Sequence, residues 1–257
     1  MTSVIYTSQQ KSNKHILSLE AKRIEKNLEE AFDYTNRISV YMGKQIAEHG
    51  SNDLQYILNL FRKTSGTQYK AQNLFSWSLF DWVAPNNLQL VNSKNGISKS
   101  PPDMSHREYT WKSPKHPWTL QVSKPAVGNP SGKWVIPAGT GIVDKDNNYL
   151  GAIVVGFNII ELTERVKNNL SEKQVSFIIL DNEYRIVMQS TDNDINPASD
   201  YYKELFSSNS PFEENSGTIS VNSKYNHIDY QHYRKIKGYP YTVLTGFNRQ
   251  IIDKEFN

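Results

Sequence analysis

The sequence predicts an α+β protein in which a long N-terminal helix is followed by two tandem domains, each with an antiparallel central sheet. Three observations support this prediction. An apolar seam with helical spacing runs through residues 17–42. A strand pair at residues 80–93 returns at residues 177–190 with the same order of residue types. The tripeptide Gly-Phe-Asn ends a strand-like run twice, at residues 156–158 and again at residues 246–248.

The long helix is predicted because residues 8–49 contain no proline and only one glycine, Gly43. Its apolar or small residues recur in steps of four and three, which is a heptad seam. The seam contains Leu17, Ala21, Ile24, Leu28, Ala31, Thr35, Ile38 and Met42, and a second apolar edge contains Phe32, Tyr34, Tyr41 and Ile46. One edge can pack on the chain's own sheets and the other on a second copy, so we expect a homodimer through this helix. The alternative is that both edges pack within the chain.

The remaining elements follow from turn residues and apolar periodicity. The first domain has a short helix capped by Ser51 or Asn52, a strand pair around the Asn86–Asn87 turn, a proline-rich loop with a short helix, a strand at residues 119–127, and a hairpin at residues 134–158. A connecting helix begins at residue 159. After it the same plan restarts, and this indicates a duplicated unit. We therefore predict a helix over residues 1–50 and domains at 51–170 and 171–257.

Composition excludes several classes of function. The net charge of +3 is spread along the chain without a basic block, so nucleic-acid binding is not expected. Cysteine is absent, which removes thiol nucleophiles, cysteine-bound zinc and disulfides. The sequence contains neither a G-x-S-x-G elbow nor an H-E-x-x-H motif, and its six histidines are scattered. We expect no catalytic residue, no metal site and no cofactor, and the chain is predicted not to be an enzyme.

A binding site is the better prediction. Arg107, Tyr109 and Trp111 alternate within one loop or short helix, and Ser123 belongs to a neighbouring strand. Trp77 and Trp134 fall on strands of the same domain. A guanidinium binds carboxylates through paired hydrogen bonds, so this set suits a small anionic or zwitterionic solute. The alternative is that Arg107 ties down its own loop through backbone carbonyls.

The pattern resembles the double Cache domain, the extracytoplasmic sensor module of bacterial transmembrane receptors. The resemblance rests on the long helix, on two PAS-like units in tandem, on "DMSHREYTW" (residues 103–111) and on "GKWVIPAGTGIVDKDNNYLGAIVVGFNI" (residues 132–159). It implies the periplasmic part of a membrane-anchored inner-membrane protein. The output it favours is a sensor histidine kinase. The alternatives are a chemoreceptor, a diguanylate cyclase, or a structural dimerisation ectodomain without a small-molecule ligand.

The resemblance also implies where a ligand binds. The membrane-distal domain, residues 51–170, would hold it, and residues 171–257 would lie next to the membrane. The amino-acid-binding branch of the family carries Tyr and Asp where this chain has Ala126 and Gly128, and a final Asp where it has Asn158. Asparagine lacks the charge that holds an ammonium group, so we expect a carboxylate or another small solute without an amine. The predicted ligand-binding residues are Trp77, Arg107, Tyr109, Trp111, Ser123, Trp134 and Asn158.

Overall fold

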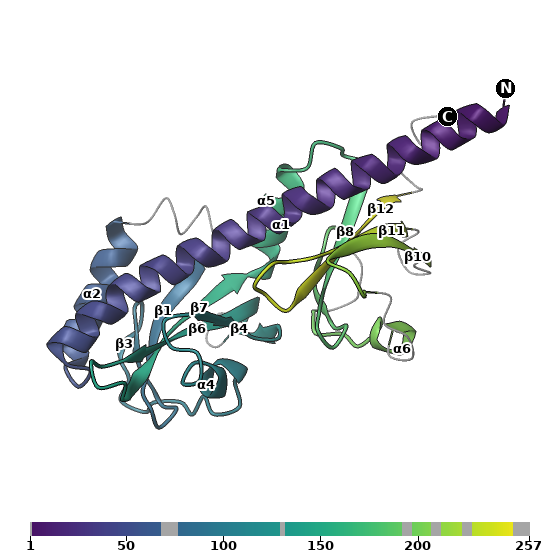
Figure 1. The fold of residues 1–257 in the computed structure, drawn as a ribbon. Coiled ribbons are helices and arrows are strands. Elements are labelled where there is room, and N and C mark those ends of the chain that lie inside the picture. The colour runs from purple at the N-terminus through teal and green to yellow at the C-terminus, as the bar shows by residue number, and fades with distance from the viewer. Residues whose placement is uncertain are drawn as a thin grey trace. The chain divides into compact units, whose positions relative to one another are not determined.

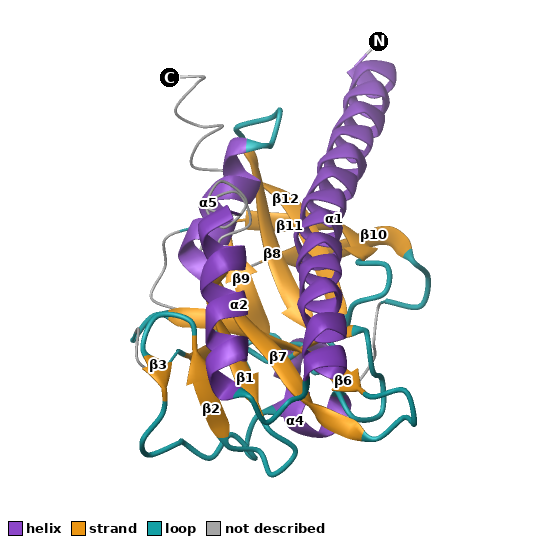
Figure 2. Cartoon of the chain, turned by 90° about the vertical axis from the view of Figure 1, so that its left-hand side faces the viewer, coloured by secondary structure: helices purple, strands orange, loops and turns teal. Residues whose placement is uncertain are grey.

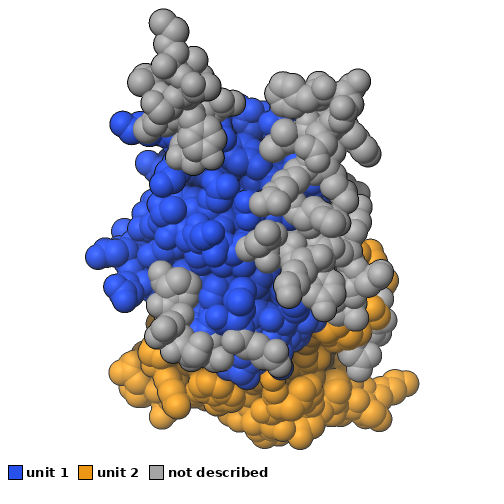
Figure 3. Space-filling model, turned by 90° about the vertical axis from the view of Figure 1, so that its right-hand side faces the viewer, with its two compact units in different colours: residues 1–29, 163–257 blue, residues 30–162 orange. Residues whose placement is uncertain are grey.

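The computed structural model describes residues 2–67, 77–128, 132–191, 197–206, 212–222 and 228–248. These residues belong to two compact units (Figure 3). Unit 1 combines residues 1–29 with residues 163–257, and unit 2 is residues 30–162. The predicted fold class is confirmed: a long N-terminal helix accompanies two antiparallel sheets, one in each unit.

Helix α1 (Thr2–His49) is continuous and contributes residues to both units (Figure 1). Its heptad seam is buried within the single chain, with every member at most 1% exposed except the half-buried Ile38. Phe32 and Ile46 of the second edge are buried as well, whereas Tyr41 is 59% exposed. The seam therefore packs within the chain, as expected for one of the two edges, and a homodimer through this helix stays a prediction.

Unit 2 contains a seven-stranded sheet in the order β3-β2-β1-β7-β6-β4, with β5 paired to β6. Its elements are α2 (Leu54–Thr67), β1 (Trp77–Val83), β2 (Gln89–Asn92), β3 (Gly96–Ile97), α4 (Glu108–Lys112), β4 (Leu120–Val122), β5 (Ala126–Val127), β6 (Trp134–Val143) and β7 (Tyr149–Asn158). The strand predicted at residues 119–127 is split around Pro125, because proline has no N–H for the ladder. Asp53 caps α2 by accepting from the Tyr56 N–H at 2.9 Å, in place of the predicted Ser51 or Asn52.

The two faces of this sheet carry different helices (Figure 2). Phe80 of β1 contacts Phe61 of α2, and Phe157 of β7 contacts Phe32 of α1. Alternation along the strands turns Asp81, Val83 and Val154 to the opposite face. There Tyr109 of α4 packs on Val83 and Val154. Helices α1 and α2 thus cover one face, and α4 with its preceding loop covers the other.

Unit 1 contains a five-stranded sheet in the order β10-β11-β12-β8-β9. Helix α5 (Ile159–Asn168) leads into β8 (Val175–Asp181), β9 (Ile186–Gln189), α6 (Lys203–Phe206), β10 (Ser216–Asn222), β11 (Ile228–Lys235) and β12 (Tyr241–Asn248). One face of the sheet packs on α1, where the Thr245 hydroxyl donates to the Leu17 carbonyl at 3.1 Å. The other face holds an aromatic core that includes Tyr202, Phe206 and Tyr230.

The structure explains the repeated strand pair. In both units the second strand lies beside the first, the first beside the last, and the last beside the penultimate one. In unit 2 the Phe80 N–H donates to Ser93 Oγ at 3.1 Å, and the Ser93 N–H returns to the Phe80 carbonyl at 2.8 Å. Phe177 and Ser190 make the same pair of bonds in unit 1, at 2.8 and 2.9 Å. The Phe and Ser positions recur in the sequence because the same pair of hydrogen bonds joins the first two strands of the strand pair in each unit.

Candidate functional site

Unit 2 contains a pocket of about 320 Å³ between the β2–β3 hairpin and the loop that precedes α4. Its polar lining consists of Gln89, Asn92, Asn95, Ser98, Asp103, His106 and Arg107, and Val91, Pro102 and Met104 supply apolar surface. The volume suits a small metabolite, and the mixture of apolar walls with a few polar groups is typical of ligand sites.

The loop that closes this pocket is held in place by hydrogen bonds. The Gln89 N–H donates to the Pro102 carbonyl at 3.0 Å, and the Met104 N–H donates to the Asn87 carbonyl at 2.9 Å. The Asp103 carboxylate accepts from the Ser105 N–H at 2.8 Å and from the Ser105 hydroxyl at 3.0 Å. These two bonds lower the pKa of Asp103. The lining is therefore held in place without a ligand.

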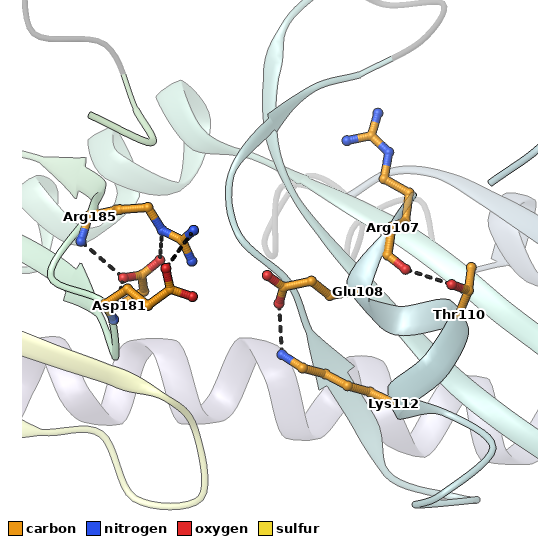
Figure 4. A network of polar contacts seen from close by, with 7 residues as sticks. Arg107, Glu108, Thr110, Lys112, Asp181 and Arg185 are labelled. Atoms are coloured by element: carbon orange, nitrogen blue, oxygen red, sulfur yellow. Dashed lines mark hydrogen bonds and ion pairs between the residues drawn. The ribbon is translucent and has the colours of Figure 1, made fainter. Parts of the chain in front are cut away.

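Arg107 stands at the start of α4 and lines the pocket. Its backbone carbonyl accepts from the Thr110 hydroxyl at 2.6 Å, and its side chain extends away from the Glu108–Lys112 ion pair (Figure 4). A guanidinium nitrogen donates to the Val127 carbonyl at 3.3 Å. Arg107 thus combines a brace to β5 with a place in the pocket wall, and a guanidinium has donors to spare for a ligand.

Tyr109 lies beneath the loop and is only 1% exposed. Its ring packs with Val83, Ala152 and Val154 on the sheet. Within the residues that the structure describes, its buried hydroxyl has no hydrogen-bond partner. Burial raises the pKa of Tyr109, and the negative charge of Asp81 raises it further. The phenol therefore lies within electrostatic reach of Asp81.

Asp81 is a residue that the sequence interpretation missed. It lies on β1 opposite Asn92 of β2, and its Oδ1 accepts from Gln89 Nε2 at 2.8 Å and from Asn92 Nδ2 at 2.6 Å. Burial raises the pKa of Asp81 to about 7, although the two amide bonds oppose that shift. Both amides belong to the pocket wall. The available signal was an acidic residue inside the otherwise apolar strand "WSLFDWV".

Four other predicted ligand residues lie elsewhere in unit 2. Trp111 is 52% exposed, and Lys112 and Lys115 place their ammonium groups 5.3 and 5.6 Å from its ring centre. Ser123 is buried, and its N–H donates to the Pro137 carbonyl at 2.8 Å. Trp134 is half-buried where β6 begins, opposite Val127. Trp77 opens β1, and its side chain lies outside the described residues. None of these four is among the residues that line the pocket.

Asn158 ends β7 and caps α5. Its Oδ1 accepts from the N–H groups of Ile160 at 3.1 Å and Glu161 at 3.4 Å, and its Nδ2 donates to Glu161 Oε1 at 2.6 Å. The first "GFN" therefore ends in a helix cap, for which asparagine is a preferred residue. A ligand-binding role of Asn158 stays a prediction.

Within the described residues, no group of three or more His, Asp or Glu side chains is arranged to hold a metal ion. No helix in that part of the chain has the length and apolar character needed to cross a bilayer.

Comparison with known proteins relies on structure alone, because no family model and no curated protein matches the sequence. An extracellular ligand binding receptor from Desulfohalobium retbaense DSM5692 superposes with a TM-score of 0.67 at 10% identity, covering 90% of this chain and 40% of that one. The ligand-binding domain of the Campylobacter jejuni chemoreceptor Tlp3, in complex with L-valine, gives 0.61 at 15% identity, covering 98% and 97%.

The sensor domain of the V. cholerae histidine kinase DctB gives a TM-score of 0.56 at 13% identity and covers 95% of this chain and 98% of that one. At these identities the likeness concerns the fold. It agrees with the long helix, the two antiparallel sheets and the repeated strand order described above. The chain therefore has the fold of a double Cache sensor domain.

Proposed function

We propose that this chain is the extracytoplasmic ligand-sensing domain of a membrane-anchored signalling receptor, without catalytic activity of its own, and that unit 2 binds a small carboxylate. The observation that carries the proposal is the pocket at Arg107, which lies in the unit where the ligand of such a domain is expected. The fold shared with a chemoreceptor domain and a histidine kinase sensor domain supports the sensory role.

The chemistry of the lining supports a carboxylate. Arg107 is the arginine of the pocket, and the amide and hydroxyl groups around it are neutral. The carboxylate of Asp103 is already engaged by Ser105. L-valine, bound in the Tlp3 complex, carries an ammonium group as well as a carboxylate. Asp103, the acidic residue of the described pocket lining, is therefore not free to hold an ammonium group, so we propose a carboxylate without an amine.

The test is a thermal-shift screen of the purified domain against small carboxylates, because a ligand stabilises the folded state in proportion to its occupancy. Arg107→Ala should weaken the binding of an identified carboxylate roughly tenfold or more, since a charged hydrogen bond contributes about 1.5–3 kcal/mol. Arg37→Ala is the matched control, because Arg37 is exposed on α1 of the same unit and stacks on Tyr34. Lower stability of ligand-free Arg107→Ala with unchanged affinity would make Arg107 only a brace.

For the output we propose a sensor histidine kinase, with a chemoreceptor as the second candidate. The DctB comparison supports the first and the Tlp3 comparison supports the second. The full receptor in membranes, supplied with labelled ATP, should incorporate phosphate at a rate that changes with the ligand. Methyl transfer to the receptor without phosphate incorporation would select the chemoreceptor, and synthesis of a cyclic dinucleotide would select a diguanylate cyclase.

We also propose that two copies associate through α1. Because the seam is buried within the chain, the contact must use outward positions such as Tyr41, which is 59% exposed, and Leu19, which is 46% exposed. Sedimentation should show association that Tyr41→Glu abolishes and that Thr119→Glu, at an exposed position outside α1, does not. An associating domain that responds to no solute would favour the structural ectodomain instead.

A further inference from the structure

The orientation of the Gln89 side chain is fixed by Asp81. An ionised carboxylate only accepts hydrogen bonds, so an amide beside it must present its nitrogen. Gln89 Nε2 lies 2.8 Å from Asp81 Oδ1, and the carbonyl oxygen of the same amide therefore faces away from Asp81. The Asp81 carboxylate therefore determines which end of the Gln89 amide faces it.

The neighbouring amide is fixed in the same way, with a different outcome. Asn92 Nδ2 donates to Asp81 at 2.6 Å, and Asn92 Oδ1 accepts from the N–H groups of Lys94 at 3.0 Å and Asn95 at 2.8 Å. The carbonyl oxygen of Asn92 is thus used in holding the β2–β3 turn. Within the described part of the chain, no donor reaches the carbonyl oxygen of Gln89, and Gln89 lines the pocket.

We infer that Gln89, positioned by Asp81, makes the Arg107 pocket selective for a hydroxycarboxylate. The pocket offers a cation at Arg107 and an open acceptor at Gln89, so its best ligand has a carboxylate and a hydroxyl donor. An oxo acid of the same size would set its carbonyl oxygen against the carbonyl oxygen of Gln89. This inference rests on the proposed function, because it names the ligand class of the same site.

An amino acid also carries a donor, but the geometry favours a neutral one. An ammonium group needs a carboxylate with a free oxygen. Both oxygens of Asp103 accept from Ser105, and Asp81 is not among the residues that line the pocket. A hydroxyl needs only the single acceptor that Gln89 provides.

The experiment measures affinities for matched hydroxy and oxo acids of roughly three to six carbons, a size suited to this pocket. The corresponding amino acids complete the panel. Titrations are run well above the pKa of Asp81, so that its carboxylate is ionised. The wild-type domain should prefer the hydroxy acid over its oxo partner by about five- to tenfold, which corresponds to one neutral hydrogen bond.

Four variants test whether Gln89, positioned by Asp81, causes the preference for the hydroxy acid. Gln89→Met should abolish the preference and still bind both acids through Arg107. Gln121→Met is the matched control, because Gln121 lies on β4 and does not line the pocket. Asp81→Ala frees the Gln89 amide to turn and should lower the ratio of affinities, whereas Asp81→Asn retains an acceptor oxygen and should restore it.

The outcomes separate this inference from the proposed function. Binding of both acids with equal affinity, or a preference that survives in Gln89→Met, overturns the selectivity and leaves the carboxylate sensor in place. Stronger binding of the amino acid than of the hydroxy acid overturns it as well. A domain that no carboxylate stabilises overturns the proposed function, and this inference falls with it.

Discussion

Replacing Asp81 with asparagine should stabilise the protein in alkaline solution and leave its stability in acid almost unchanged. Burial raises the pKa of Asp81 from 3.8 to about 7, so between these pH values the folded state binds more protons at this site than the unfolded state. The contribution of Asp81 to the free energy of unfolding therefore falls as the pH rises through this window and is constant above it. Asparagine does not titrate, so the substitution removes this pH-dependent contribution to the free energy of unfolding.

The size of the effect follows from the same shift. A pKa displaced from 3.8 to about 7 corresponds to about 4 kcal/mol of unfavourable free energy at a pH above both values. This is an upper bound, since Asp81 keeps some contact with solvent and is screened there. We expect Asp81→Asn to gain about 2–4 kcal/mol at about pH 8.5, and close to nothing at about pH 4. Urea unfolding at the two pH values measures both numbers.

Equal changes at both pH values would refute this reasoning, as would a carboxyl pKa near 3.8 measured by NMR. Asp181→Asn in unit 1 is the control with the opposite sign. The Asp181 carboxylate accepts from Arg185 Nε at 2.7 Å and from the Glu183 N–H at 2.8 Å. Its replacement weakens a charged pair, so it should destabilise the protein at neutral pH.

Substitutions at four further positions test local assignments. Asn158→Ala should lower the free energy of unfolding by about 1 kcal/mol through loss of a helix cap, while Asn158→Ser keeps an uncharged cap acceptor and should lower it less, as thermal denaturation followed by circular dichroism can show. Gly246→Ala should destabilise unit 1 by about 1–3 kcal/mol in urea, because a Cβ atom there would overlap the backbone of Asp229. Ser93→Ala should cost about 1 kcal/mol and Ser190→Ala at least as much, because both hydroxyls accept from a phenylalanine N–H and Ser190 Oγ also donates to the Phe177 carbonyl at 3.2 Å. A smaller cost at Ser190 than at Ser93 in urea unfolding would contradict this assignment.

The fold was predictable because its determinants are local. The sequence itself shows the period-two strands, the separation of the two "GFN" strand ends and the Phe–Ser spacing. The matching hydrogen bonds of Phe80 and Phe177 explain why that spacing occurs twice. Strand β3, only Gly96–Ile97, was missed because two residues carry no periodicity. The heptad in α1 predicted an amphipathic helix correctly, but an apolar seam has no feature that tells a partner chain from the protein's own sheets.

The site was less predictable because it depends on register. Arg107 was identified from its residue type, and the structure places it in a pocket wall. Asp81, Asn92 and Gln89 fall in two different strands, and they meet only because Asp81 pairs with Asn92 across the β1–β2 ladder. A shift of one residue in that register would turn Asn92 to the other face and leave the carboxylate without one of its donors. The roles of these side chains arise from strand pairing, and no residue spacing in the sequence indicates them. Asn158 differs, because an asparagine directly before a helix indicates a helix cap.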